Sequence, residues 1–219
     1  MAWSYSALKA FETCARQYHE ISILKSYPWE ETQQQRYGLQ VHKAAEDFVT
    51  KGVPIPAKFS FMQGVLDAMM AKPGKKYGEQ KLAINDKLEP CKWMAKDVWV
   101  RAIVDLLIVD EDNKLAWAID WKTGNAKYAD TDQLDVMSLV LFAHYPRITR
   151  VRSALVFVTN NGFIKHKRTT EEKEKLWWTY RERVAKIDKA HASGVWNPTS
   201  SGLCKKHCAV LSCEYNGRR

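Results

Sequence analysis

The pattern of apolar and polar positions along the chain predicts alternating helices and strands. Apolar residues recur every three or four positions in segments that we predict to be helices, over residues 4–24, 37–51, 59–71, 131–144 and 170–193. Apolar runs rich in β-branched and aromatic residues predict strands over residues 79–85, 98–109, 115–122, 153–159 and 164–168. This order favours an α/β fold class, with a central mixed β-sheet flanked by helices and a helical region at the N-terminus.

Two neighbouring predicted strands each carry a carboxylate among apolar residues. Asp105 lies within the first strand, and the second strand ends with Asp120-Trp121-Lys122. A turn centred on Asp112-Asn113 would set Asp105 opposite Asp120, and Lys122 would share their face because side chains two apart on a strand point the same way. A turn one residue earlier or later would move Asp105 to the other face of the sheet.

Two carboxylates beside a lysine have two interpretations. Close carboxylates call for a cation or a raised pKa, and oxygen ligands suit magnesium, so this set predicts a metal site that hydrolyses a phosphodiester. The alternative is a structural ion pair between Asp120 and Lys122 at the end of a strand. Other acid-x-Lys triplets, at residues 79–81, 112–114 and 171–173, lack the apolar context of Asp120.

Polar residues on two predicted helices are further candidates for the site. His42 and Glu46 lie one turn apart on a helix that begins near Gly38, so they share a face. A histidine in such a position is more often a surface or core residue than a metal ligand. Gln133 lies in the first turn of the helix over residues 131–144.

The order of these residues resembles a known family of nucleases. Gly38-x-x-x-His42, an isolated Asp105, Asp120-x-Lys122-Thr123-Gly124 and a helix that opens with Gln133 resemble the PD-(D/E)XK nuclease superfamily. Within it, the likeness is to the RecB-type exonuclease branch, which includes phage exonucleases and CRISPR-associated RecB-like nucleases. The segment Tyr5–Tyr18 resembles the helix that often opens proteins of this branch. The resemblance therefore implies a restriction-endonuclease-like core.

The resemblance also implies a set of metal ligands. His42, Asp105 and Asp120 would bind Mg²⁺ or Mn²⁺, with help from the backbone carbonyl of Trp121. The chain departs from the family at Ala102, three residues before Asp105, where the family often has Gly. This departure removes no ligand.

The reaction follows from the same resemblance. Lys122 would orient or deprotonate the attacking water, and Gln133 would contact DNA near the site, although Met137 stands one turn later where the family often has Tyr. We therefore expect a Mg- or Mn-dependent deoxyribonuclease, an exonuclease that acts in DNA repair or phage recombination. The alternatives are a structure-selective or sequence-specific endonuclease on the same fold and a non-catalytic DNA-binding module.

The cysteines form a second group of candidate ligands. Cys204, Cys208 and Cys213 lie close together in the sequence, and Cys14 could supply a fourth thiolate across the fold. No secretory signal is recognisable, and clustered cysteines in such a protein more often bind metal than form disulfides. In iron-sulfur members of the resembled branch, one N-terminal and three C-terminal cysteines hold a 4Fe-4S cluster, so the resemblance implies this cofactor. Zinc, with His207 as a further ligand, and free thiols are the alternatives.

Length and composition bound the domain organisation. A chain of 219 residues with 46% hydrophobic content can bury one substantial core. We expect a nuclease-like domain over residues 1–198 and a cysteine-rich metal-binding extension over residues 199–219, packed against the N-terminal helix.

Charge and hydropathy suggest the partners. The net charge is +9, and residues 147–183 contain ten Lys or Arg against four Glu, which favours DNA over a basic protein that merely stays soluble. No apolar stretch is long enough to cross a membrane, so we expect a cytoplasmic protein, in the host cell if the chain is phage-encoded. The resembled branch includes ring-forming proteins, which leaves open a homo-oligomer and a recombination partner protein.

Overall fold

The computed structural model describes residues 2–28, 31–158 and 162–218. These residues form two compact units. We refer to Glu31–Trp177 as the sheet unit, and to Trp3–Glu30 together with Trp178–Arg219 as the terminal unit.

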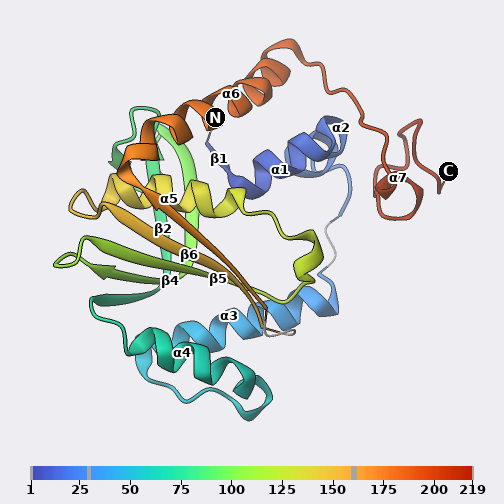
Figure 1. The fold of residues 1–219 in the computed structure, drawn as a ribbon. Coiled ribbons are helices and arrows are strands. Elements are labelled where there is room, and N and C mark those ends of the chain that lie inside the picture. The colour runs from blue at the N-terminus through green and yellow to red at the C-terminus, as the bar shows by residue number, and fades with distance from the viewer. Residues whose placement is uncertain (1, 29–30, 159–161, 219) are drawn as a thin grey trace. The chain divides into compact units, whose positions relative to one another are not determined.

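The sheet unit is organised around a mixed β-sheet (Figure 1). The strands of this unit are β2 (Lys75–Asn85), β3 (Pro90–Cys91), β4 (Val98–Asp110), β5 (Leu115–Lys122), β6 (Arg150–Phe157) and β7 (Gly162–Thr169). They follow the spatial order β3-β2-β4-β5-β6-β7, in which β5 and β6 are parallel and the other neighbours are antiparallel. The predicted α/β class with a central mixed sheet is confirmed.

Helices cover both faces of this sheet (Figure 1). On one face lie α3 (Gln33–Lys51) and α4 (Gln63–Met70), which follows the 3-10 helix η2 (Ala57–Met62). On the other face lies α5 (Asp132–His144), which also makes the crossover that the parallel pair β5 and β6 requires. The core beneath α3 and α4 consists of Val41, Ala45, Phe59, Met62, Leu66, Leu106, Ile108, Ile119, Trp121, Ala154, Val156 and Val158.

Two glycines allow α3 to lie close against the sheet. A Cβ atom on Gly78 of β2 would lie 2.8 Å from Cγ2 of Thr50 on α3, so this position needs a residue without a side chain. A Cβ atom on Gly38 of α3 would lie 3.3 Å from Oγ1 of Thr123, in the loop that follows β5. The first half of α3, which carries His42, is therefore held beside the end of β5.

The hairpin of β4 and β5 has the predicted register. Leu106 pairs with Ile119 and Leu107 pairs with Ala118, so one further step sets Asp105 opposite Asp120. The turn between the strands occupies residues 111–114, as the prediction requires. By the alternation of side chains along a strand, Asp120 belongs to the face that α5 covers, where Gln133 contacts it, while Asp105 at the end of the ladder contacts His42 of α3.

Several element boundaries differ from the prediction. β2 begins at Lys75, where two successive lysines weaken the apolar signal of a strand, and β6 begins at Arg150, where exposed arginines alternate with buried Val151. α3 begins at Gln33, four residues early, where Thr32 and Gln35 form a capping box. The last residue of one predicted strand, Thr159, lies outside the described residues.

The N-terminal part of the terminal unit contains α1 (Tyr5–Thr13), α2 (Ala15–Tyr18) and the π-helical turn η1 (His19–Ile23), preceded by the short β1 (Trp3–Ser4). The prediction of one continuous helix over residues 4–24 is therefore wrong. Cys14 adopts an extended backbone, with φ −165° and ψ 109°, and its sulfur accepts a hydrogen bond from the backbone N–H of Gln17. The thiol thus caps a new helix instead of continuing the first one.

The C-terminal part of the same unit contains the residues of α6 (Lys173–Ser193) from Trp178 onward and the short α7 (Leu203–Lys206). Arg183 donates hydrogen bonds to both carboxylate oxygens of Glu12 at 2.7 Å, and Tyr180 stacks on Trp3. These contacts join the two ends of the chain. No helix among the described residues has the length and apolar character needed to cross a membrane. The predicted domain boundary at residue 198 stays a prediction.

Candidate active site

Asp105 connects three elements of the sheet unit. Its Oδ2 accepts a hydrogen bond from the backbone N–H of Trp121 on β5 at 2.8 Å. Its Oδ1 lies 3.2 Å from Nδ1 of His42 on α3, and the side chain is 11% exposed. Such charge-assisted contacts hold the carboxylate in one orientation at the end of the β4 and β5 ladder.

Asp120 is buried on β5 and lies against two polar side chains. Nζ of Lys122 lies 2.7 Å from Oδ2, and the amide nitrogen of Gln133 on α5 donates a hydrogen bond to Oδ1. Lys122 also donates to the amide oxygen of Gln133 at 2.9 Å. The three side chains form a closed ring in which each fixes the position of the other two, which offsets the cost of burying a carboxylate.

The surroundings shift the pKa of two groups in the site. Burial, followed by the negative charge of Asp105, raises the pKa of Asp120 to about 6, while Lys122 acts in the opposite direction. Burial lowers the pKa of His42, but the hydrogen bond and the charge of Asp105 outweigh burial and raise the pKa above its usual value. Two carboxylates that disfavour each other's charge create a position at which a further cation is stabilised.

The donor atoms of this site suit a hard divalent cation. Asp105 and Asp120 supply carboxylate oxygens, and the backbone carbonyl of Trp121 is an oxygen donor between Asp120 and Lys122 in the sequence. Across residues 2–28, 31–158 and 162–218, no three or more His, Cys, Asp or Glu side chains are arranged to hold a metal ion. Lys122 instead provides positive charge beside the two carboxylates. The donor chemistry fits Mg²⁺ or Mn²⁺.

The geometry agrees with a comparison against protein families. The model of the PD-(D/E)XK nuclease superfamily matches residues 2–215 of the chain. The chain belongs to the PD-(D/E)XK nuclease superfamily. The likeness seen in the sequence is therefore confirmed at the level of the superfamily, and the RecB-type branch stays a prediction.

Two solved structures are similar to this superfamily member. The crystal structure of a "putative exonuclease" from Eubacterium rectale has a TM-score of 0.53 at 12% sequence identity, covering 92% of this chain and 85% of that chain. The crystal structure of SSO0001 has a TM-score of 0.45 at 10% identity, covering 98% of this chain and 87% of that chain. At sequence identities this low, the first likeness concerns the fold alone. No curated protein matches the chain.

The structure brings together all the residues that the sequence predicted for the nuclease site. They come from α3, β4, β5 and α5, and they are His42, Asp105, Asp120, Trp121, Lys122 and Gln133. Their roles stay predictions. Met137, which stands where the family often has Tyr, is 2% exposed and packs in the core, so it makes no contact with DNA in this arrangement.

The four predicted cysteine ligands all lie in the terminal unit. The backbone N–H of Thr199 donates to the sulfur of Cys14 at 3.4 Å, and the thiol of Cys204 donates to the carbonyl of Thr199 at 3.7 Å. Cys208 and Cys213 are buried together with Val210. Burial raises the pKa of the Cys213 thiol. The thiols thus form two neighbouring groups, and the described residues contain no metal-holding arrangement of three or more ligands.

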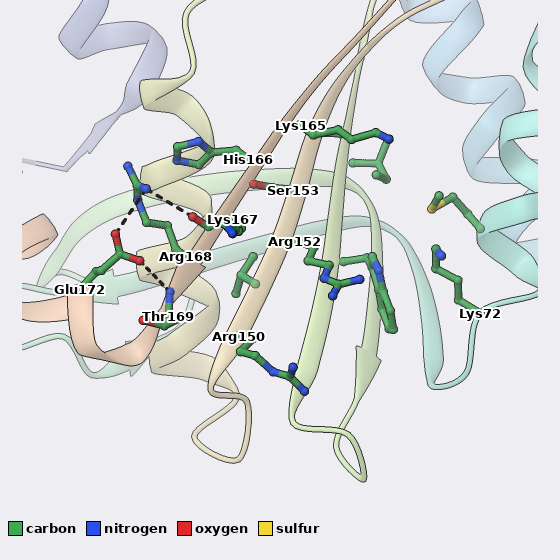
Figure 2. Close-up of a pocket in the computed structure, with 15 residues that line it drawn as sticks. Lys72, Arg150, Arg152, Ser153, Lys165, His166, Lys167, Arg168, Thr169 and Glu172 are labelled. Carbon is green, nitrogen blue, oxygen red and sulfur yellow. Dashed lines mark hydrogen bonds and ion pairs between the residues drawn. The ribbon is translucent and has the colours of Figure 1, made fainter.

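Sequence reasoning missed a group of cations on the sheet. Lys72, Arg150, Arg152, Lys165 and Lys167 line a cavity of about 990 Å³ (Figure 2). The sequence showed the charge excess of residues 147–183. It was not used to predict which of these cations share one face of the sheet. The alternation of side chains along a strand could have revealed this group, because residues two positions apart point to the same face. Arg150 and Arg152 therefore share a face, as do Lys165 and Lys167.

Proposed function

We propose that this protein is a metal-dependent deoxyribonuclease that degrades DNA from an end. The observation that carries the proposal is the set of Asp105, Asp120, Lys122 and Gln133, in which two carboxylates lie beside an amine at the end of two paired strands. Membership of the PD-(D/E)XK nuclease superfamily supports the reaction class. The RecB-type resemblance supports attack from an end, and a setting in cytoplasmic DNA repair or phage recombination.

Each residue of the set has a chemical task in this proposal. His42, Asp105, Asp120 and the carbonyl of Trp121 would hold Mg²⁺ or Mn²⁺. The ion, when bound, lowers the pKa of a coordinated water and neutralises charge on the phosphate. Lys122 would orient the attacking water and stabilise the negative charge that develops on the phosphate oxygens.

Gln133 would act as a positioning residue. Its amide oxygen accepts from Nζ of Lys122, and its amide nitrogen donates to Asp120. This double contact keeps the amine directed along one line and prevents the lysine from turning away from the carboxylates. Precise positioning of this kind contributes to catalysis because the charged groups need no rearrangement during the reaction.

The central experiment uses purified protein, Mg²⁺ or Mn²⁺, and two DNA substrates. A linear duplex should be shortened, while a covalently closed circle of the same sequence should stay intact. Asp120→Ala should leave both substrates intact, and Lys114→Ala is a matched control because this residue lies in the β4–β5 turn, away from the set. Cutting of the closed circle would replace the exonuclease with an endonuclease. Intact linear DNA in the presence of either metal would leave only a DNA-binding module.

The metal requirement can be tested without measuring activity. Calorimetric titration of Mn²⁺ should give binding to the wild-type protein that Asp105→Ala and Asp120→Ala each remove. Binding of Mn²⁺ that is equal in the three proteins would contradict these ligands.

We propose in addition that Cys14, Cys204, Cys208 and Cys213 hold a 4Fe-4S cluster. The support is that Cys14 and Cys204 both contact the backbone of Thr199, while Cys208 and Cys213 are buried together in the same unit. Thiolate ligands suit iron-sulfur clusters or zinc. Protein purified without oxygen should be brown and lose its colour in Cys208→Ala. A colourless protein that contains equimolar zinc would assign the site to zinc instead.

A further inference from the structure

One face of β6 and β7 carries a row of exposed cations. Arg150 and Arg152 project from β6, and Lys165 and Lys167 project from the adjacent β7. With Lys72, which follows α4, they surround the cavity of about 990 Å³ (Figure 2). We call these five residues the cationic face. Figure 2 shows Arg150 and Arg152 leaving β6 on the same side.

Two charges of the cationic face oppose each other. Arg152 lies directly opposite Lys167 in the register of β6 and β7, and like charges at such positions destabilise a sheet. No carboxylate among the residues that the structure describes forms an ion pair with Arg152, Lys165 or Lys167. Glu172 lines the same cavity but is bound to Arg168 at 3.4 Å and to the backbone N–H of Thr169 at 2.9 Å. These exposed charges are therefore open to a ligand that carries negative charge.

The other face of β7 shows how this fold treats cations that serve only its structure. His166 and Arg168 point toward α5, where Asp135 lies 2.6 Å from Nε2 of His166 and 2.8 Å from Nε of Arg168. Within the part of the chain that the structure describes, the cations on one face of the strand have an acid and those on the other face have none. The contrast indicates that the exposed cations are kept for a ligand.

The arrangement suits a chain of phosphates better than one phosphate. Cations two residues apart on a strand are about 6.6 Å apart, so β6 and β7 each present positive charge at repeated intervals. Aromatic rings lie on the same face, because Trp117 lines the cavity and Phe163 is 48% exposed on β7. Nζ of Lys72 lies 5.3 Å from the centre of the Trp117 ring. Cations that alternate with exposed rings are typical of surfaces that bind single-stranded nucleic acid.

We propose that the cationic face binds a single strand of DNA at a site separate from the carboxylates. Trp117 pairs with Arg152 across β5 and β6, and their face is the one that α3 and α4 partly cover. Asp120 points to the opposite face, toward Gln133 of α5. The proposal rests on the proposed function, since it takes DNA as the substrate, and it adds a second contact that holds the strand between successive cuts.

The test measures binding in EDTA, where the DNA is not cut. A labelled oligonucleotide of roughly 16 nucleotides is long enough for a single-strand site. The double variant Arg152→Ala with Lys167→Ala should bind at least about tenfold more weakly, and the slope of log affinity against log salt should fall by about 1.4, or about 0.7 for each lost phosphate contact. Both effects should be read from fluorescence anisotropy over a salt series.

Two matched variants make the test specific. Lys87→Ala with Lys92→Ala removes the same charge beside β3, at the opposite edge of the sheet, and should bind DNA as the wild type does. Arg152→Lys with Lys167→Arg keeps the charge and should also retain binding. Thermal melting verifies that all variants are folded. Equal weakening in the two alanine pairs would overturn the proposal, because net charge alone would then set the affinity.

A competition experiment identifies the source of the phosphate. A deoxynucleoside monophosphate should displace the oligonucleotide only at concentrations far above that of the competing strand. Displacement at equal phosphate concentration would make the cavity a nucleotide pocket and overturn the proposal.

The two proposals can fail separately. If wild-type protein cuts no DNA but the Arg152 and Lys167 pair still governs binding, the proposed function is lost and the cationic face stands. If cutting depends on Asp120 but the pair has no effect on binding, the reverse holds. If both proposals hold, the double variant Arg152→Ala with Lys167→Ala should also release DNA after fewer cuts than the wild type. This is measured in the presence of a trap such as heparin, which prevents rebinding.

Discussion

The two faces of the sheet treat charge in opposite ways. In the carboxylate set, which α5 and the first half of α3 flank, both carboxylates have partners: Asp120 has Lys122 and Gln133, and Asp105 has His42. On the cationic face, Arg152 and Lys167 oppose each other, and no acid of the described residues forms an ion pair with either. The first region is arranged before any ligand arrives, and the second is complete only with one. The difference separates a region suited to chemistry from a region suited to holding a polyanion.

This contrast has a physical basis in burial. Asp120 is 5% exposed, and a charge at such a position requires partners because water is excluded. Arg152 and Lys167 are exposed, so water and salt screen their repulsion and the fold tolerates it. Unpaired charges on the exposed face therefore cost little stability, and they remain accessible to DNA.

The largest effect should come from the amine of the carboxylate set. Lys122→Met keeps the length of the side chain but removes its charge, and we expect cleavage to fall by about 10³-fold because a positioned charge is lost from the reaction. Binding of single-stranded DNA in EDTA should stay close to that of the wild type. Cleavage within a few-fold of the wild type would mean that the ring of Asp120, Lys122 and Gln133 is structural.

A stability measurement tests the paired cations on the inner face of β7. Asp135→Asn leaves His166 without its acid and Arg168 with Glu172 alone, so we expect the free energy of unfolding to fall by about 3 kcal/mol. Urea denaturation gives this value directly. Arg152→Gln on the exposed face serves as the comparison and should cost almost nothing. Equal losses in the two variants would remove the distinction between structural and ligand-binding cations.

The pH dependence of stability should reveal the buried carboxylate in metal-free protein. The pKa of Asp120 is raised to about 6 from 3.8, so between these values the folded state binds more protons than the unfolded state. This group therefore favours folding at low pH, and the contribution is lost as pH rises from about 4 to about 6, by an amount on the order of 3 kcal/mol. The difference between wild type and Asp120→Asn, measured by denaturation in EDTA, isolates it. A difference that is constant over this range would contradict the raised pKa.

The smallest expected effect links stability to binding on the cationic face. Lys167→Glu replaces a repulsive pair with an attractive one opposite Arg152, so stability should rise by about 0.2 to 1 kcal/mol. The same change should weaken binding of single-stranded DNA more than Lys167→Ala does. A variant that gained stability without losing affinity would show that this pair does not contact DNA.

The sequence was sufficient to predict that Asp105 and Asp120 lie opposite each other, because the two residues belong to neighbouring segments of the chain. Asp105 and Asp120 lie on strands joined by a short turn, and side-chain alternation in a hairpin follows from the turn alone. The contact between His42 and Asp105 joins residues more than sixty positions apart in the sequence, and the likeness to a family suggested it where periodicity did not. The break at Cys14 was not predictable from apolar spacing, because Leu8, Phe11 and Tyr18 continue the helical pattern across it.

Apolar spacing and strand alternation by themselves determined the α/β class, the hairpin and the candidate carboxylates with their lysine. Only the tertiary structure decided which cations acquire an acid and which do not, because Asp135 reaches His166 and Arg168 from a helix that packs on one face of the sheet. It also decided that α3 lies beside the end of β5, where the absence of a side chain at Gly38 and Gly78 allows close packing. Local pattern fixes the direction in which a side chain points, and packing between distant segments fixes what it meets there.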